Sequence, residues 1–214
     1  MSTEVRLPSS VRPPMSGLVL CGGASVRMGS EKALIEIGGK PLVLVVADTV
    51  ARVADPVLLA TGRVGRLGPL GYTEVADEAA EAGPLGGIVA GLAASPHEQM
   101  AVVAVDMPFA SGEVLALLAA LHRDEDAVVP LSDHGVEPLH AVYSRRALPA
   151  LRSALNGGTH SMRMVLKGLR VREVPEAGWR AADPTGRFAV NVNSPEDLVT
   201  LGPWRGRSPS RRAR

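Results

Sequence analysis

The sequence predicts an α/β fold, a Rossmann-like three-layer α/β/α sandwich with a mostly parallel sheet. Short continuous apolar runs, such as GLVLC at 17–21 and AVVAV at 101–105, alternate with longer helical patterns. Strands that are apolar throughout are typical of parallel sheets covered by helices on both faces. With 46% hydrophobic residues, a chain of 214 residues can form a substantial buried core. Ligands bind such sheets at the carboxyl ends of the strands.

The first half of the chain contains three expected strands and two expected helices. The apolar run at 17–21 is the first strand, PVLLA at 56–60 the second, and 72–76 a weaker third. Residues 41–53 have helical periodicity, with a proline in the first turn, where proline is tolerated. Residues 86–94 form the second expected helix.

The second half continues the alternation. AVVAV at 101–105 reads as a buried strand, and 111–122 as a helix capped by Ser111, because a serine hydroxyl can accept a hydrogen bond from the first turn. The remaining expected strands are 127–130, 139–143 and 171–174, and the remaining expected helices are 147–155, 161–169 and 195–201.

The two ends differ from the middle in composition. Residues 1–15 contain three prolines and few apolar side chains, and residues 203–214 contain five arginines and two prolines. We therefore expect both ends to be disordered, with one domain over 16–202 between them. The basic tail could contact an anionic partner, although a solvated tail is the simpler interpretation.

Charge and cysteine content restrict the class of protein. The formal net charge is +1, so no overall field favours nucleic acid or a membrane surface, and we expect neither as a partner. Cys21 is the single cysteine and no Cys/His cluster has zinc-ligand spacing, which favours a reducing compartment. Because the sequence shows no signal-peptide core and no membrane-length apolar run, we expect a cytoplasmic protein.

The stretch LCGGASVRMGSEKA at 20–33 follows the first expected strand. Its glycines, including the adjacent pair Gly22 and Gly23, allow a sharp turn that presents backbone N–H groups. Arg27 and Lys32 add two positive charges, and together these features suit a polyphosphate. The pattern matches neither the Walker A loop nor the G-x-G-x-x-G fingerprint. An ordinary tight turn with surface charges is the alternative.

A second polar feature is Asp106, which follows the apolar run 101–105 and precedes Pro108. Proline stops the strand there, so the carboxylate is expected at the ligand edge. Polyphosphate chemistry uses Mg²⁺, which proteins hold with one or two carboxylates plus phosphate oxygens. Asp106 is therefore the candidate Mg²⁺ ligand; the alternative is a turn cap before the helix at Ser111.

These residues carry a resemblance to a known family. The pattern L-x-G-G-x-S-x-R-M-G-x-x-K is similar to the signature of nucleotidyltransferases that act on the molybdenum cofactor. The matching residues are Leu20, Gly22, Gly23, Ser25, Arg27, Met28, Gly29 and Lys32.

Further segments resemble the bacterial molybdenum cofactor guanylyltransferases in order and spacing, over roughly 16–202. They are Asp77, GPLGG at 83–87, VDMP at 105–108, PLHAVY at 138–143 and NVNSPEDL at 191–198. The opening signature is shared with cytidylyltransferases and sugar nucleotidyltransferases, whereas GPLGG and NVNSPED are similar to the guanylyl branch.

The resemblance implies a fold like that of the nucleotide-diphospho-sugar transferases and a Mg²⁺-dependent reaction. In it, the terminal phosphate of molybdopterin, with or without molybdenum, attacks the α-phosphorus of GTP, giving the dinucleotide cofactor and pyrophosphate. Proteins that insert molybdenum or accept the product are further implied partners. The attacking phosphate is already an anion, so the protein must mainly position two anions and neutralise their charge.

The resemblance also implies site residues. Arg27, Lys32 and Asp106 are the implied catalytic residues, and Asp106 the implied Mg²⁺ ligand. The implied GTP contacts are Leu20, Cys21, Gly22, Gly23, Lys32, Asp77 and Asp106. The implied molybdopterin contacts are Asn191 and Asn193, whose amides can donate and accept; the alternative makes Asn193 a cap before Pro195.

One segment of the family pattern has two possible interpretations, and two positions depart from the pattern. The glycines at 83–87 resemble a flexible segment that closes over the base, and a plain helix N-terminus is the alternative. Cys21 replaces a usual alanine, a small-for-small change. Thr61 lies in the segment where an asparagine often holds the nucleotide, so that contact is either lost or supplied by Thr61.

Other functions also fit parts of the pattern. The same superfamily contains molybdopterin cytidylyltransferases, which use CTP, and sugar or phospholactate-type guanylyltransferases, which use another acceptor. A non-catalytic carrier of molybdopterin is a different class. The combination of Arg27, Lys32 and Asp106 argues against a carrier, because carriage alone needs no triphosphate cradle.

Overall fold

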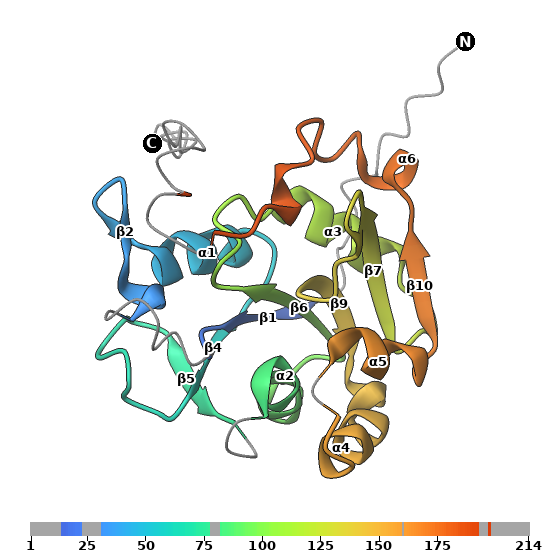
Figure 1. Ribbon diagram of the computed structural model, residues 1–214, viewed down its shortest axis with the longest axis horizontal. Helices are drawn as coiled ribbons and strands as arrows, with labels where there is room; N and C mark the ends of the chain where they lie inside the picture. Colours follow the sequence, from blue (N-terminus) through green and yellow to red (C-terminus); the bar gives the residue numbers. More distant parts are fainter. Residues whose placement is uncertain (1–13, 23–30, 78–81, 160, 193–196, 198–214) are drawn as a thin grey trace.

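The computed structural model describes residues 14–22, 31–77, 82–159, 161–192 and 197. Figure 1 shows a twisted sheet between two layers of helices, with α1, α3 and α6 on one face and α2, α4 and α5 on the other. This arrangement confirms the predicted three-layer α/β fold.

Eight strands form the main sheet in the described part of the chain, in the order β10-β7-β9-β6-β1-β4-β5, and β8 pairs with β7. The strands of this sheet are β1 Met15–Leu20, β4 Val57–Gly62, β5 Thr73–Ala76, β6 Gln99–Ala104, β7 Ala127–Ser132, β8 Gly135–Val136, β9 His140–Ser144 and β10 Val171–Val174. The pairs β1–β4, β1–β6, β4–β5 and β7–β10 are parallel. Strand β9 is antiparallel to β6 and β7, so the sheet is mostly parallel, as predicted.

The helices connect these strands and cover both faces of the sheet. The α-helices are α1 Leu42–Ala51, α2 Gly83–Ala94, α3 Gly112–Leu121, α4 Leu148–Asn156, α5 Met162–Lys167 and α6 Glu176–Trp179. The short 3-10 helices are η2 Lys32–Leu34, η3 Arg145–Ala147 and η4 Arg187–Ala189, and a small hairpin joins β2 Glu36–Ile37 to β3 Lys40–Pro41.

Alternation along the strands distributes the core between the two faces. In β1, Val19 packs in the cluster beside α1 and α3, whereas Leu18 and Leu20 pack in the cluster beside α2. Successive side chains of a strand point to opposite faces, so both faces of β1 need apolar residues. Every residue of β1 is buried, which explains the unbroken apolar run Leu18–Leu20, and the one polar side chain, Ser16, accepts a hydrogen bond from the Ser95 hydroxyl at 2.8 Å.

Most expected elements are present with shifted ends. The strand expected at 171–174 has those bounds, and Ser111 caps α3 as predicted, accepting from the Val114 N–H at 3.2 Å. Strand β1 begins at Met15, a buried residue that the expected disordered segment 1–15 included. The helix expected at 195–201 lies outside the described residues except for Asp197.

The structure decides between the two alternatives for the segment 83–87. It forms the first turns of α2, so the helix N-terminus is confirmed and the flexible segment is not, and its glycines allow close packing. A Cβ on Gly87 would lie 2.8 Å from Leu20 Cδ2 of β1 and 3.0 Å from the Ala60 Cβ of β4. The glycine pattern therefore reflects the close approach of α2 to the sheet.

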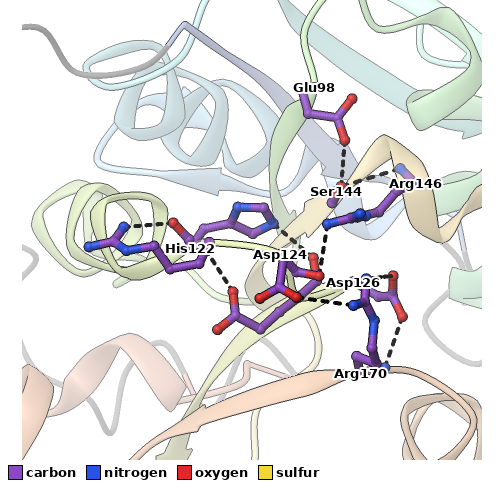
Figure 2. Close-up of polar contacts among 9 residues, drawn as sticks. Glu98, His122, Asp124, Asp126, Ser144, Arg146 and Arg170 are labelled. Carbon is purple, nitrogen blue, oxygen red and sulfur yellow. Dashed lines mark hydrogen bonds and ion pairs between the residues drawn. The ribbon is translucent and has the colours of Figure 1, made fainter.

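The amino edge of the parallel strands carries a network of polar contacts, shown in Figure 2. The Ser144 hydroxyl donates to Glu98 Oε1 at 2.7 Å, which links the end of β9 to the start of β6. The Arg170 N–H donates to Asp126 Oδ2 at 2.9 Å and links β10 to β7. These side chains satisfy one another's hydrogen-bonding groups, so we interpret the network as structural. It holds together the strand ends at this edge, which is opposite the edge where ligands bind.

Close packing at Gly17 leads to a first prediction. A Cβ at this position in β1 would lie 2.3 Å from Val50 Cγ1 of α1. We expect Gly17→Ala to destabilise the protein by about 1–3 kcal/mol, because the stiff valine cannot move aside in a packed core. Urea unfolding of Gly17→Ala, Val50→Ala and the double variant measures this. The alanine should cost less in the Val50→Ala background, and equal costs in both backgrounds would contradict the packing explanation.

Candidate active site

The candidate site lies where the carboxyl ends of β1, β4 and β6 meet (Figure 1). The Val105 N–H, directly after β6, donates to the Leu20 carbonyl at 3.0 Å. The Cys21 N–H donates to the Ala60 carbonyl of β4 at 2.8 Å. These bonds hold Cys21, and with it the exposed Gly22, between the two neighbouring strands. The glycine-rich stretch thus begins at the predicted edge of the sheet.

Asp106 and Lys32 form an ion pair at this edge. Lys32 Nζ lies 3.3 Å from Asp106 Oδ2, although the residues are 74 positions apart in the chain. Lys32 begins η2, and its side chain is 13% exposed, while that of Asp106 is 29% exposed. The structure therefore brings together the cation predicted for the phosphates and the carboxylate predicted for the metal.

The C-terminal segment also reaches Asp106. The Val192 N–H donates to the main-chain carbonyl of Asp106 at 2.8 Å. Val192 is buried, whereas Asn191 beside it is exposed. Asn191 is therefore next to a residue that is bonded to the Asp106 loop. Asn193 lies outside the described residues.

Asp77 follows β5 and occupies a space bordered by glycines. Its N–H donates to the Gly62 carbonyl at 3.2 Å. A Cβ on Gly22 would lie 3.8 Å from Asp77 Oδ2, and one on Gly87 would lie 3.6 Å from Oδ1. Oδ1 is buried with no hydrogen-bond partner among the described residues. Burial raises the pKa of this carboxyl, and the charge of Arg66 opposes the shift. The orphaned oxygen is an acceptor suited to a ligand N–H.

Arg66 is a residue that the sequence interpretation missed. Its Nη2 donates to the Cys21 carbonyl at 2.7 Å, and its Nη1 lies 2.7 Å from Glu31 Oε1. The guanidinium thus joins two residues ten positions apart that flank the glycine-rich stretch. Arg66 lies in a glycine-rich run where nothing in the local sequence distinguishes it from the exposed Arg63.

Thr61 does not take the role of the missing asparagine. The residue is 1% exposed. Its hydroxyl lies 3.0 Å from the Arg63 carbonyl and 2.9 Å from Glu74 Oε2. Of the two alternatives for this position, loss of the asparagine contact therefore fits the structure better, because the Thr61 hydroxyl is used inside the protein to shape the turn after β4.

The remaining predicted residues divide into two groups. Cys21 is buried and its thiol has a pKa raised to about 12, mainly by burial, so its contribution to the site comes from the main chain. Gly23 and Arg27 lie outside the described residues, and their roles stay predictions.

The chemistry of the site follows from this arrangement. Within the described ranges, no three His, Cys, Asp or Glu residues are close enough to form a metal cage. A hard cation here would be shared between the Asp106 carboxylate and a bound anion, which is how proteins usually hold Mg²⁺. Lys32 adds a positive charge, Leu20 to Gly22 a main-chain cradle, and Asp77 an acceptor. This set suits an anionic nucleotide.

In the part of the chain that the structure describes, no helix is both long and apolar enough to cross a membrane. The expected cytoplasmic location stays a prediction.

Comparisons with known proteins identify the family of the chain. Residues 17–174 match the MobA-like NTP transferase domain family. A probable molybdenum cofactor guanylyltransferase from Methanosarcina mazei is 37% identical, over 94% of this chain and 96% of that protein. The molybdenum cofactor guanylyltransferase of Desulfosudis oleivorans is 35% identical, over 86% and 92%.

A solved structure provides the same comparison in three dimensions. The molybdopterin-guanine dinucleotide biosynthesis protein A of Archaeoglobus fulgidus superposes with a TM-score of 0.76 at 28% identity, covering 87% of this chain and 96% of that one. The sequence signature, the arrangement of the strand ends and these similarities agree. The chain therefore belongs to the family of MobA-like NTP transferase domains and is a nucleotidyltransferase.

Proposed function

We propose that this protein transfers GMP from GTP to the terminal phosphate of molybdopterin, with or without molybdenum, and releases pyrophosphate. The observation that carries this proposal is the double main-chain connection of the Asp106 segment. Val105 is bonded to Leu20 of the nucleotide cradle, and Asp106 is bonded to Val192 of the C-terminal segment. The names of the relatives supply the nucleotide and the acceptor.

On the nucleotide side, Gly22 is exposed at the strand edge, whereas the N–H and the carbonyl of Cys21 are bonded to Ala60 and Arg66 and hold the turn in place. Lys32 is close enough to Asp106 to reach the same phosphates. Asp77 offers its unpaired Oδ1 to an N–H of the nucleotide. The guanidinium of Arg27 and the N–H of Gly23 are further proposed phosphate contacts, from the sequence signature.

In the reaction, an oxygen of the acceptor phosphate forms a bond to the α-phosphorus, and the bond from that phosphorus to the β-phosphate oxygen breaks. The electron pair of the broken bond leaves with pyrophosphate. Because the acceptor phosphate is itself the nucleophile, no residue needs to act as one. Lys32 neutralises charge that repels the incoming phosphate, and the fixed loops hold the two groups in line.

The residues present fit a Mg²⁺ ion. Asp106 presents a partly exposed carboxylate that is paired with Lys32 through one of its oxygens, Oδ2. Bound there with the phosphates, Mg²⁺ would neutralise the charge that develops on pyrophosphate. The protein's own part is to hold the carboxylate in place through the main-chain bonds on both sides of Asp106.

On the acceptor side, we assign Asn191 and Asn193 to molybdopterin. We expect Asn191→Ser to weaken molybdopterin binding about tenfold, because one hydrogen bond to a charged ligand contributes about 1.5–3 kcal/mol. GTP affinity should stay near that of the unmodified protein. Titration calorimetry with each ligand measures both values. Asn156→Ser, at the end of α4, is the control. Unchanged molybdopterin affinity would remove Asn191 from the site.

A product assay tests the whole proposal. The purified protein is incubated with molybdopterin, Mg²⁺ and GTP, CTP, ATP or UTP in turn, and dinucleotide products are identified by mass. We expect the guanine dinucleotide as the main product. A cytosine dinucleotide would reassign the protein to the cytidylyltransferases. Binding of molybdopterin with no product from any nucleotide would favour a carrier. Proteins that insert molybdenum or accept the product stay predicted partners.

A further inference from the structure

His140 is a buried histidine at the ligand edge of the sheet. It is the first residue of β9 and is 0% exposed. Because β9 is antiparallel to β6, this first residue lies beside Val103, near the carboxyl end of β6 from which the Asp106 loop departs. None of the roles described above uses its side chain.

The imidazole of His140 accepts a hydrogen bond from the end of the Asp106 loop. The Ser111 N–H donates to His140 Nε2 at 3.1 Å. Ser111 caps the N-terminus of α3, so its N–H lies before the helical hydrogen-bond ladder and needs another acceptor. The loop 105–110 is thereby fastened at both ends, by Leu20 at its start and by His140 at its finish.

The same ring packs against the C-terminal segment. The ring centroids of His140 and Phe188 are 4.7 Å apart. Phe188 belongs to η4 and is fully buried, four residues before Val192, whose N–H binds the Asp106 carbonyl. A second contact joins the same two segments: the Arg187 guanidinium lies 3.7 Å from the centroid of the Phe109 ring. His140 therefore contacts both segments that frame the proposed acceptor site.

The environment keeps this imidazole neutral. Burial lowers the pKa of His140 to about 4, and the nearby Asp183 carboxylate only partly opposes the shift. A neutral ring has the Nε2 lone pair that the Ser111 contact requires. The other nitrogen, Nδ1, is buried without a partner among the described residues. An unpaired buried N–H destabilises the folded protein, and an apolar residue at this position would avoid that cost. The specific contribution of the histidine is therefore the hydrogen-bond acceptor for the Ser111 N–H.

We propose that His140 is a positioning residue, which holds the Asp106 loop and the segment at 187–192 in a constant relative position. This proposal rests on the proposed function, in which those segments bind the two substrates. A misplacement of reacting groups by about 1 Å can lower a rate about a hundredfold. Loss of His140 should therefore act mainly on kcat, after both substrates have bound.

The test compares four variants at two histidines of the α3 region. His140→Leu removes the acceptor, whereas His140→Gln places an amide oxygen near the position of Nε2. His122 is the matched control, because it is 8% exposed and follows the other end of α3, where its Nε2 bonds to the Glu125 carbonyl (Figure 2). His122→Leu and His122→Gln should cost stability without changing the site.

We expect His140→Leu to lower kcat about thirtyfold or more, with the KM for GTP and the KM for molybdopterin changed less than about threefold. His140→Gln should recover most of the lost kcat. Both His122 variants should keep the kcat of the unmodified protein, measured well below their unfolding temperatures. Equal loss of kcat in His140→Leu and His122→Leu would reduce the effect to stability. Failure of glutamine to restore kcat would overturn the assigned contact to Ser111.

A second measurement needs no substrate. Hydrogen exchange of the Ser111 and Val192 amides reports on the two fastened segments directly, and we expect both to exchange at least about tenfold faster in His140→Leu. If His140→Leu does not fold, Phe188→Leu tests the ring contact in the same way and should accelerate Val192 alone. Unchanged exchange in folded His140 variants would overturn the proposal. Because this measurement is independent of turnover, an inactive unmodified protein would refute the proposed function without deciding the role of His140.

Discussion

Replacing Asp106 with asparagine is expected to lower turnover about a hundredfold or more, because it removes a charge that stabilises the transition state. Asparagine has nearly the same shape, and the bond from the Val192 N–H is to the main-chain carbonyl, which the substitution leaves in place. The fold should therefore survive. The measurement is kcat at saturating GTP, molybdopterin and Mg²⁺.

The control for this variant is a second aspartate in a similar ion pair. Asp48 pairs with Lys40 and also accepts from the Tyr72 hydroxyl at 3.0 Å, outside the candidate site. Asp48→Asn should change turnover less than about twofold, since exposed ion pairs contribute little. Near-normal turnover in Asp106→Asn would remove Asp106 from the proposed metal site. A matching loss in Asp48→Asn would point to a general effect of losing a carboxylate.

Lys32→Ala is expected to weaken GTP binding about tenfold to a hundredfold, since a hydrogen bond to a charged group contributes about 1.5–3 kcal/mol. The lysine side chain is mostly buried and pairs with Asp106 at the edge where the phosphates are proposed to bind. Molybdopterin affinity should stay near that of the unmodified protein. Titration calorimetry of the variant with GTP and with molybdopterin gives both affinities.

Lys40→Ala is the matched control, because Lys40 also pairs with an aspartate but belongs to the small hairpin at β3. It should bind GTP as the unmodified protein does. Normal GTP binding in Lys32→Ala would reduce Lys32 to a structural partner of Asp106. The triphosphate would then depend on Arg27 and the main chain.

The regular elements could be predicted because their signals are local. The strand at 171–174 was expected with the bounds that the structure has. The strand expected at 101–105 is shifted to Gln99–Ala104 because pairing with β1, and not the apolar run alone, decides where it starts and ends. The hairpin of β2 and β3 and the four-residue helix α6 are too short to produce a periodic pattern.

The segment 83–87 shows how packing decides what composition leaves open. The sequence left two alternatives open there, a flexible segment implied by the family resemblance and a plain helix N-terminus. In the protein the segment begins α2, and Gly87, which has no side chain, allows the helix to lie against Leu20 and Ala60. The local sequence could not decide between the alternatives, because this contact is made with strands that are distant in the chain.

The sequence by itself determined the fold class and the family and indicated the candidate site residues Lys32, Asp77 and Asp106, because strand patterns and motif spacing lie within short stretches of chain. Only the tertiary structure decided which of these residues touch. The Lys32–Asp106 pair spans 74 positions, the bond from Arg66 to Cys21 spans 45, and the bond from Ser111 to His140 spans 29. Such contacts arise when the sheet places distant strand ends at one edge, and a single residue such as Arg66 or His140 carries no local signal of them.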